Sequence, residues 1–151
     1  MAPDSQQHPP LIQALLRPEA YPHPVQRLEL IETHISWVIL TGGIAYKIKK
    51  PVKLGFVQAA TLQQRLHYCH EELRLNRRLA PDLYLDVVPV FGPETEARIG
   101  AISLDQDGQA NRDLIDAAVK MREFAPQQLL SRALAKGTIT STQLSLSLIH
   151  I

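Results

Sequence analysis

The segment from residue 61 to residue 80 restricts the fold of this chain more than any other. Four apolar residues recur in it at helical spacing and form one stripe: Leu62, Leu66, Cys69 and Leu73. Thr61 can cap the start of the helix, Gln64 three residues later completes a capping box, and Pro81 follows its end. This is the clearest helix pattern in the chain. An apolar stripe on one side of a helix has to be buried, so we expect this stripe to lie against a sheet.

Six segments around this helix have the composition or alternation of β-strands. They cover residues 28–32, 37–40, 44–50, 83–91, 97–104 and 117–122. Three precede the helix and three follow it, so we expect neighbours in the sequence to pair antiparallel. Pro89 indicates an edge or a bulge in the fourth strand. The predicted fold is α+β: a twisted antiparallel sheet of about five or six strands with one long helix on a face.

The chain divides into four parts. Residues 1–24 form an N-terminal extension with a short helix over Leu11–Leu16, and residues 25–124 hold the sheet and the long helix. Residues 125–145 include a further helical pattern. Residues 146–151 resemble the translation of a common sequencing-adapter end, so we expect a non-native tail there.

The composition argues against several classes of protein. A chain with 45% hydrophobic and 21% charged residues is globular rather than disordered. The net charge of +1 lacks the basic excess of a dedicated nucleic-acid binder. A single cysteine, Cys69, allows no internal disulfide and fits a reducing compartment. With no secretion-signal pattern and no apolar stretch of membrane-spanning length, we expect a cytoplasmic protein without a membrane partner.

The third predicted strand carries a candidate nucleotide-binding lysine. Ala45 and Lys47 share one face of this strand. The small residue could leave space for adenine while the ammonium group reaches the α- and β-phosphates, as in kinases. A lysine on a strand can also be a solvated or edge-protecting charge. A basic cluster that could instead attract nucleic acid comprises Lys47, Lys49, Lys50 and Lys53.

A kinase lysine needs a carboxylate partner from the following helix, and two candidates occur. At about 100° per residue, Glu71 points away from the apolar stripe, whereas Glu72 lies at its flank and faces the sheet. We therefore predict that Glu72 is the partner of Lys47. The alternative is that both glutamates are surface residues paired to Arg74 or Arg78.

Two other features have structural interpretations. His67, Cys69 and His70 face different directions on the helix, whereas zinc requires convergent ligands, so no metal site is expected. Trp37 is expected as a core anchor rather than a platform for base stacking.

Five runs of residues, taken together, resemble one family. They are residues 32–38, 45–52, 69–81, 83–85 and 119–122. Over about residues 20–140 the chain resembles the aminoglycoside-phosphotransferase-like domain, which is protein-kinase-like, of bacterial proteins in which it precedes a P-loop ATP-binding module. The resemblance implies a kinase-like N-terminal lobe over 25–124. It also implies a hinge and the first helices of a truncated second lobe over 125–145.

The resemblance also implies roles for individual residues. Lys47 would hold the phosphates of ATP and Glu72 would orient it, with Ala45 beside the adenine. Met121, Glu123 and Phe124 would belong to the hinge, whose backbone groups face adenine.

The turn over residues 33–36 would lie above the phosphates. It contains no glycine, which opposes close approach of the backbone and favours weak or reshaped nucleotide binding.

Phosphoryl transfer further requires a catalytic aspartate and metal ligands. The family carries them in its second lobe on a His-x-Asp loop, and no such loop follows Gly137. Asp105 and Asp107 precede the hinge and cannot substitute. We therefore expect no catalytic residues here, no phosphate transfer by this chain, and Mg²⁺ only in the complete protein.

The expected function is the ATP-binding half of a phosphotransferase, with ATP and a downstream P-loop ATPase module as partners. The first alternative is a non-catalytic regulatory module of an ATPase. The second is a basic nucleic-acid-binding module.

Overall fold

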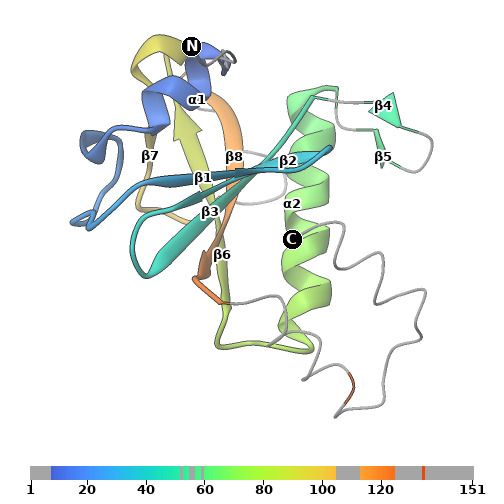
Figure 1. The fold of residues 1–151 in the computed structure, drawn as a ribbon. Helices are drawn as coiled ribbons and strands as arrows, with labels where there is room; N and C mark the ends of the chain where they lie inside the picture. Colours follow the sequence, from blue (N-terminus) through green and yellow to red (C-terminus); the bar gives the residue numbers. More distant parts are fainter. Residues whose placement is uncertain are drawn as a thin grey trace.

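The computed structural model describes residues 8–51, 53–54, 57–58, 60–104, 113–124 and 134. In these residues a six-stranded antiparallel sheet has the strand order β1-β2-β3-β8-β6-β7 (Figure 1). The strands are β1 (Glu29–Glu32), β2 (Ser36–Leu40), β3 (Ile44–Lys49), β6 (Tyr84–Phe91), β7 (Arg98–Ile99) and β8 (Leu114–Arg122). A separate hairpin joins β4 (Lys53–Leu54) to β5 (Val57–Gln58). The predicted α+β class with a six-stranded antiparallel sheet is confirmed.

The long helix α2 (Leu62–Arg77) begins where the sequence predicts. The Thr61 hydroxyl accepts a hydrogen bond from the Gln64 backbone N–H at 3.1 Å, and the Gln64 side chain accepts one from the Thr61 N–H at 3.1 Å. This reciprocal pair satisfies two of the N–H groups that a helix start leaves unpaired. The short helices are α1 (Pro10–Leu15), η1 (Pro18–Ala20) and η2 (Glu94–Glu96).

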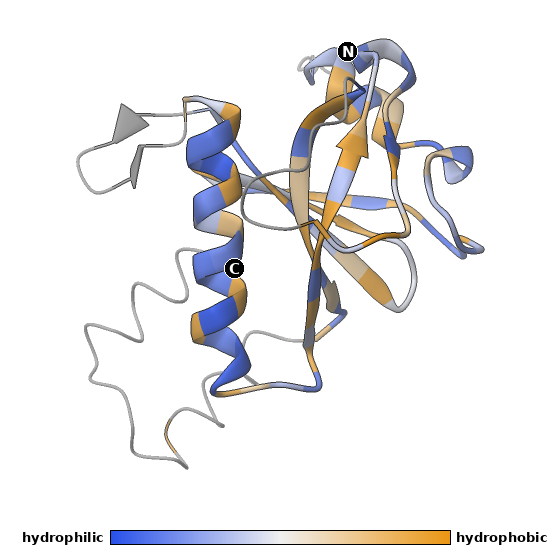
Figure 2. Cartoon of the chain, turned by 180° about the vertical axis from the view of Figure 1, so that it is seen from behind, coloured by the Kyte–Doolittle hydropathy of each residue, from blue (hydrophilic) through white to orange (hydrophobic). Residues whose placement is uncertain are grey.

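The sheet has a hydrophobic core on each face. Alternate residues of β3 enter opposite cores: Ala45 packs on the α2 side, whereas Tyr46 and Ile48 pack on the α1 side with Trp37. Trp37 is 7% exposed, which confirms its predicted place in the core. Figure 2 shows the contrast between the mainly hydrophobic central strands and the largely hydrophilic α2. The short N-terminal helix thus covers the face that α2 leaves open.

The order of the strands differs from their order in the sequence. The last strand, β8, lies between β3 and β6 and pairs with both. It contributes three fully buried residues, Ala117, Ala118 and Val119. A strand buried on both faces suits a central position, because its side chains are apolar on either side.

Two strand predictions need correction. The strand expected over 97–104 is β7, which covers only Arg98–Ile99. Pro89 lies in β6, which is not an edge strand, although register shifts at Tyr84/Asp86 and Val90/Phe91 confirm the predicted irregularity. The β4–β5 hairpin was not predicted.

The predictions for residues 125–145 and 146–151 fall on segments outside the described residues, Leu134 apart. Among the residues that the structure describes, no helix has the length and apolarity needed to cross a bilayer.

Candidate functional site

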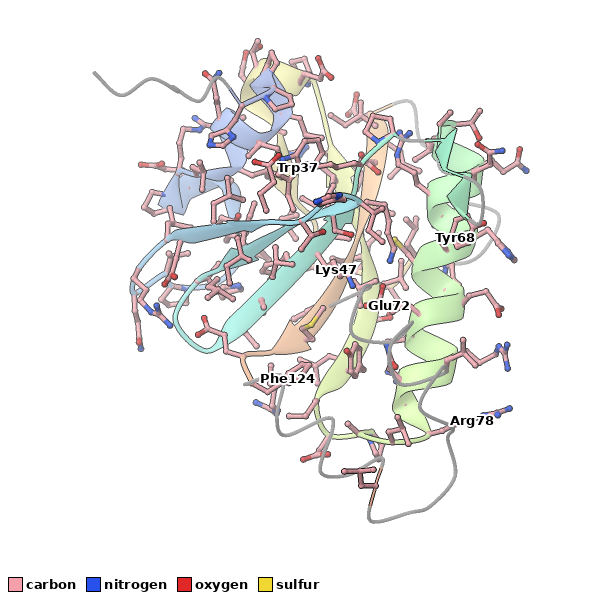
Figure 3. All side chains as sticks on the ribbon, turned by 45° about the vertical axis from the view of Figure 1, so that its right-hand side comes forward. Trp37, Lys47, Tyr68, Glu72, Arg78 and Phe124 are labelled. Atoms are coloured by element: carbon pink, nitrogen blue, oxygen red, sulfur yellow. The ribbon has the colours of Figure 1, made fainter. Side chains whose placement is uncertain are left out.

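Strand β3 and helix α2 bring Lys47 and Glu72 together. The Lys47 Nζ lies 3.0 Å from the Glu72 Oε2, and the two side chains are 0% and 4% exposed. Figure 3 shows the pair side by side between strand and helix. The predicted pairing is confirmed: the alternation of β3 aims Lys47 at α2, and the helical rotation aims Glu72 at the sheet.

A second lysine binds the same carboxylate, which sequence reasoning missed. The Nζ of Lys49 donates to the other oxygen of Glu72, and the Lys49 side chain is 3% exposed. The sequence did contain a signal for this contact: the alternation of side chains along β3 places Lys49 on the same strand face as Lys47. The interpretation of these lysines as a solvated basic cluster was wrong for both, because α2 buries them. Lys50, another member of the predicted basic cluster, pairs with a partly exposed acid, Glu32.

The neighbouring glutamate behaves as an ordinary surface residue. Glu71 forms an ion pair with Arg74 at 2.7 Å, three residues further along the helix. The alternative that both glutamates are surface residues is therefore correct for Glu71 and wrong for Glu72, which is 6% exposed.

The buried cluster of Lys47, Lys49 and Glu72 holds two cations for one anion. Burial lowers the pKa of Lys47 to about 7, although Glu72 opposes this shift. Burial by itself raises the pKa of Glu72, but the two ammonium groups outweigh it and hold that pKa below its ordinary value. Glu72 is thus ionised at neutral pH, whereas Lys47 is only partly protonated there, because Glu72 does not fully offset the burial of its ammonium group.

Unpaired polar atoms border this cluster. Ser36 lies opposite Lys49 in the β2–β3 register, so the two side chains share the α2 face of the sheet. The Ser36 Oγ and the Tyr84 hydroxyl are buried and have no hydrogen-bond partner among the described residues. Burial raises the pKa of Tyr84, and the charge of Glu72 adds to that shift. Buried polar groups normally have partners, so these two indicate a place where a polar ligand could bind.

The end of β8 supplies the segment expected to be a hinge. Met121 is buried and lies opposite Ala45 in the β3–β8 register, so the two predicted adenine neighbours are adjacent. The Phe124 ring lies 5.7 Å from the Tyr84 ring, in a tilted arrangement.

Glu123 is bonded to the β2–β3 turn through its side chain and its backbone N–H. Its carboxylate accepts hydrogen bonds from the Gly42 and Gly43 N–H groups at 2.7 and 2.9 Å, and a third from Arg27 at 2.7 Å. Its backbone N–H donates to the Gly43 carbonyl at 2.9 Å, and the Arg122 N–H donates to the Leu83 carbonyl at 2.8 Å. Two N–H groups of the expected hinge are therefore already occupied, and Glu123 ties that segment to the β2–β3 turn.

The turn between β1 and β2 bonds three of its four N–H groups internally. The Thr33 Oγ1 accepts hydrogen bonds from the N–H groups of Ile35 and Ser36 at 3.3 and 3.0 Å, and the Thr33 N–H donates to the Ser36 carbonyl at 2.9 Å. These three N–H groups are therefore bonded within the turn.

The single cysteine is unsuited to nucleophilic chemistry. Cys69 is 0% exposed, and burial raises the pKa of its thiol to about 12, so it is protonated at neutral pH. Within the described ranges, no group of three or more His, Cys, Asp and Glu side chains could hold a metal ion.

Comparison with known proteins finds relatives without an assigned activity. Over 74 residues the chain is 39% identical to uncharacterized proteins of Mycobacterium bovis and of two strains of Mycobacterium tuberculosis. The match covers 47% of this chain and 15% of each mycobacterial protein, so it spans a small part of their length. No family model matches the chain, and no solved structure matches it.

Proposed function

We propose that this chain is the ATP-binding half of a phosphotransferase of the aminoglycoside-phosphotransferase-like, protein-kinase-like type. The observation that carries the proposal is the buried pair of Lys47 and Glu72, 3.0 Å apart, between the third strand and the long helix. In kinases a strand lysine paired to a helix glutamate holds the α- and β-phosphates of ATP. An antiparallel sheet whose long helix follows the third strand supports the same assignment.

The residues of the cluster suit a polyphosphate chemically. Two buried lysines share one carboxylate, so an added anion would compensate the excess positive charge. Lys47 would bind the phosphates, Glu72 would hold Lys47 in place, and Ala45 with Met121 would border the adenine. Phe124 would extend that apolar border. ATP supplies the transferable phosphoryl group, and the residues of this chain bind and orient it.

Transfer itself lies outside this proposal. It requires a base and metal ligands that the family places in a second lobe. A P-loop ATPase module of the parent protein is accordingly a proposed partner, and the cytoplasm, where ATP is available, is the proposed location.

ATP binding by the 151-residue chain, measured by isothermal titration calorimetry, tests the proposal. Lys47→Met removes the ammonium group, keeps a side chain of similar length and leaves Lys49 to pair with Glu72. We expect it to weaken ATP binding by about tenfold to 100-fold, as for the loss of a charged hydrogen bond. Lys50→Met, at the partly exposed pair with Glu32, is the control and should bind as the wild type does. Equal binding by all three proteins, or none by the wild type, contradicts the proposal.

A regulatory module that binds ATP weakly is a second candidate, favoured by one observation. Three of the four N–H groups of the turn over residues 33–36 bond within the turn, which removes donors that a phosphate would otherwise use. A phosphate-transfer assay on the complete parent protein separates the two candidates. Transfer that Lys47→Ala abolishes favours the kinase, whereas Lys47-dependent ATP binding without any transfer favours the regulatory module.

A further inference from the structure

Lys49, the second lysine of the buried cluster, is not needed to compensate the charge of Glu72, because Lys47 already does so. One ammonium group suffices to compensate the Glu72 carboxylate, yet Glu72 pairs with Lys47 through one oxygen and with Lys49 through the other. Burying an additional charge is unfavourable unless something pairs with it. A methionine or leucine at position 49 would fill similar space without that penalty.

Among the described residues the other buried acid is Asp116, and no ion pair joins it to the cluster. Asp116 lies on β8, and its charge shifts the pKa of the Cys69 thiol, as the charges of the cluster do. It accepts from Arg65 at 3.2 Å and from the Ala117 N–H at 2.8 Å, so these hydrogen bonds of its carboxylate go to partners outside the cluster. When Lys47 is protonated, the two lysines and Glu72 therefore carry one positive charge in excess, and a bound anion would favour that protonated form.

The hydroxyl of Ser36 is the second, independent observation. Ser36 is 0% exposed and its Oγ has no partner among the described residues. It stands opposite Lys49 across the β2–β3 pair, on the face that carries the cluster. Hydroxyl and ammonium groups are donors that bind the oxygen atoms of a phosphoryl group.

We propose that Lys49 and the Ser36 hydroxyl form a phosphoryl-binding subsite beside Lys47. The proposal rests on the proposed function and adds a second cation and a neutral donor for the polyphosphate. In the ligand-free cluster the Glu72 carboxylate takes the place of the anion at Lys49. Because both ammonium groups are buried, an entering phosphoryl group must replace Glu72 at Lys49, while Glu72 keeps Lys47.

Tripolyphosphate and ATP are the two probes, titrated by calorimetry into the wild-type chain, Lys49→Met, Ser36→Ala and the control Lys50→Met. Tripolyphosphate has no nucleoside, so it separates a free phosphate source from a nucleotide. We expect Lys49→Met to bind both probes about tenfold to 100-fold more weakly, because a charged donor is lost. The control should bind both probes as the wild type does.

Ser36→Ala gives a result that a merely structural role would not produce. Removal of a buried hydroxyl without a partner should raise the Tm of the ligand-free chain, since that hydroxyl gives up its hydrogen bonds with water on folding. The same variant should bind tripolyphosphate several-fold more weakly, because the phosphoryl group loses a donor. A higher Tm with unchanged tripolyphosphate affinity overturns the proposal, and this arm decides the matter if Lys49→Met does not fold.

The two probes also separate this inference from the proposed function. If ATP binding depends on Lys47 but not on Lys49, the subsite is refuted and the proposed function stands. If tripolyphosphate binding depends on Lys49 and ATP binds no more tightly than tripolyphosphate, the subsite stands and nucleotide recognition is refuted. If neither probe binds the wild-type chain, both are overturned.

Discussion

Replacement of Glu72 by glutamine should destabilise the fold strongly, because it leaves two buried ammonium groups without their shared carboxylate. Lys47 and Lys49 are 0% and 3% exposed, so water cannot compensate their charges. Removing one partner of a buried ion pair costs about 3–5 kcal/mol. Glutamine keeps the size and one hydrogen-bond acceptor, so the loss reports charge rather than packing.

The free energy needed to remove the proton of a lysine is of the same magnitude as this cost. Removal of a lysine proton at pH 7, against an ordinary pKa of 10.5, corresponds to about 5 kcal/mol. We therefore expect Glu72→Gln to lower the free energy of unfolding by about 3–5 kcal/mol at pH 7. Because the folded variant then binds fewer protons than the folded wild type, the deficit should shrink as the pH rises from 7 towards 10.

Urea unfolding at several pH values measures this deficit, since urea leaves the ionic strength unchanged. Glu71→Gln is the matched control on the adjacent residue, where the ion pair with Arg74 is exposed to solvent and screened. It should change stability little at any pH. A deficit for Glu72→Gln that is as small as the control's, or that is the same at pH 7 and pH 10, refutes the account of the buried cluster.

Three further predictions concern the helix cap, the β2–β3 turn and Lys47. Thr61→Ala removes the capping box and should cost about 1 kcal/mol in urea unfolding; no change would contradict the cap's contribution. Gly42 and Gly43 have φ values of 93° and 131°, so replacement of either by alanine should cost about 1–3 kcal/mol. Gly42→Ala should be the worse, because its new Cβ would lie 2.8 Å from the Gln26 Cβ whereas position 43 is open; the reverse order in urea unfolding would contradict this. Because folded Lys47, with a pKa of about 7, loses its proton before an unfolded lysine at 10.5, wild-type stability should gain a contribution between pH 7 and 10 that Lys47→Met lacks; parallel pH profiles would contradict the shift.

Local periodicity was enough to predict the central contact of the site. Alternation along β3 places Ala45 and Lys47 on one face, and the rotation of α2 separates Glu72 from Glu71. Both are short-range properties of the backbone, so they do not depend on the rest of the fold. The Thr61 cap was predictable for the same reason.

Other features depend on contacts that the sequence does not contain locally. The position of β8 between β3 and β6 joins segments far apart in the chain, and no local pattern encodes that order. Lys49 was missed because lysine is rarely buried, so its place beside Lys47 suggested a solvated charge. The bonds from Glu123 to the Gly42 and Gly43 amides link residues about 80 positions apart.

The most direct test of the central claim is chemical labelling of the chain by an acyl phosphate of ATP, followed by peptide mapping. Such a reagent transfers its acyl group to a lysine that contacts the phosphates, and a lysine with a lowered pKa is the better nucleophile. If Lys47 binds the phosphates of ATP, acylation should occur in the β3 peptide at Lys47, and excess ATP should suppress it. Acylation spread over exposed lysines, at a rate that excess ATP does not change, would contradict the assignment of Lys47 to nucleotide binding.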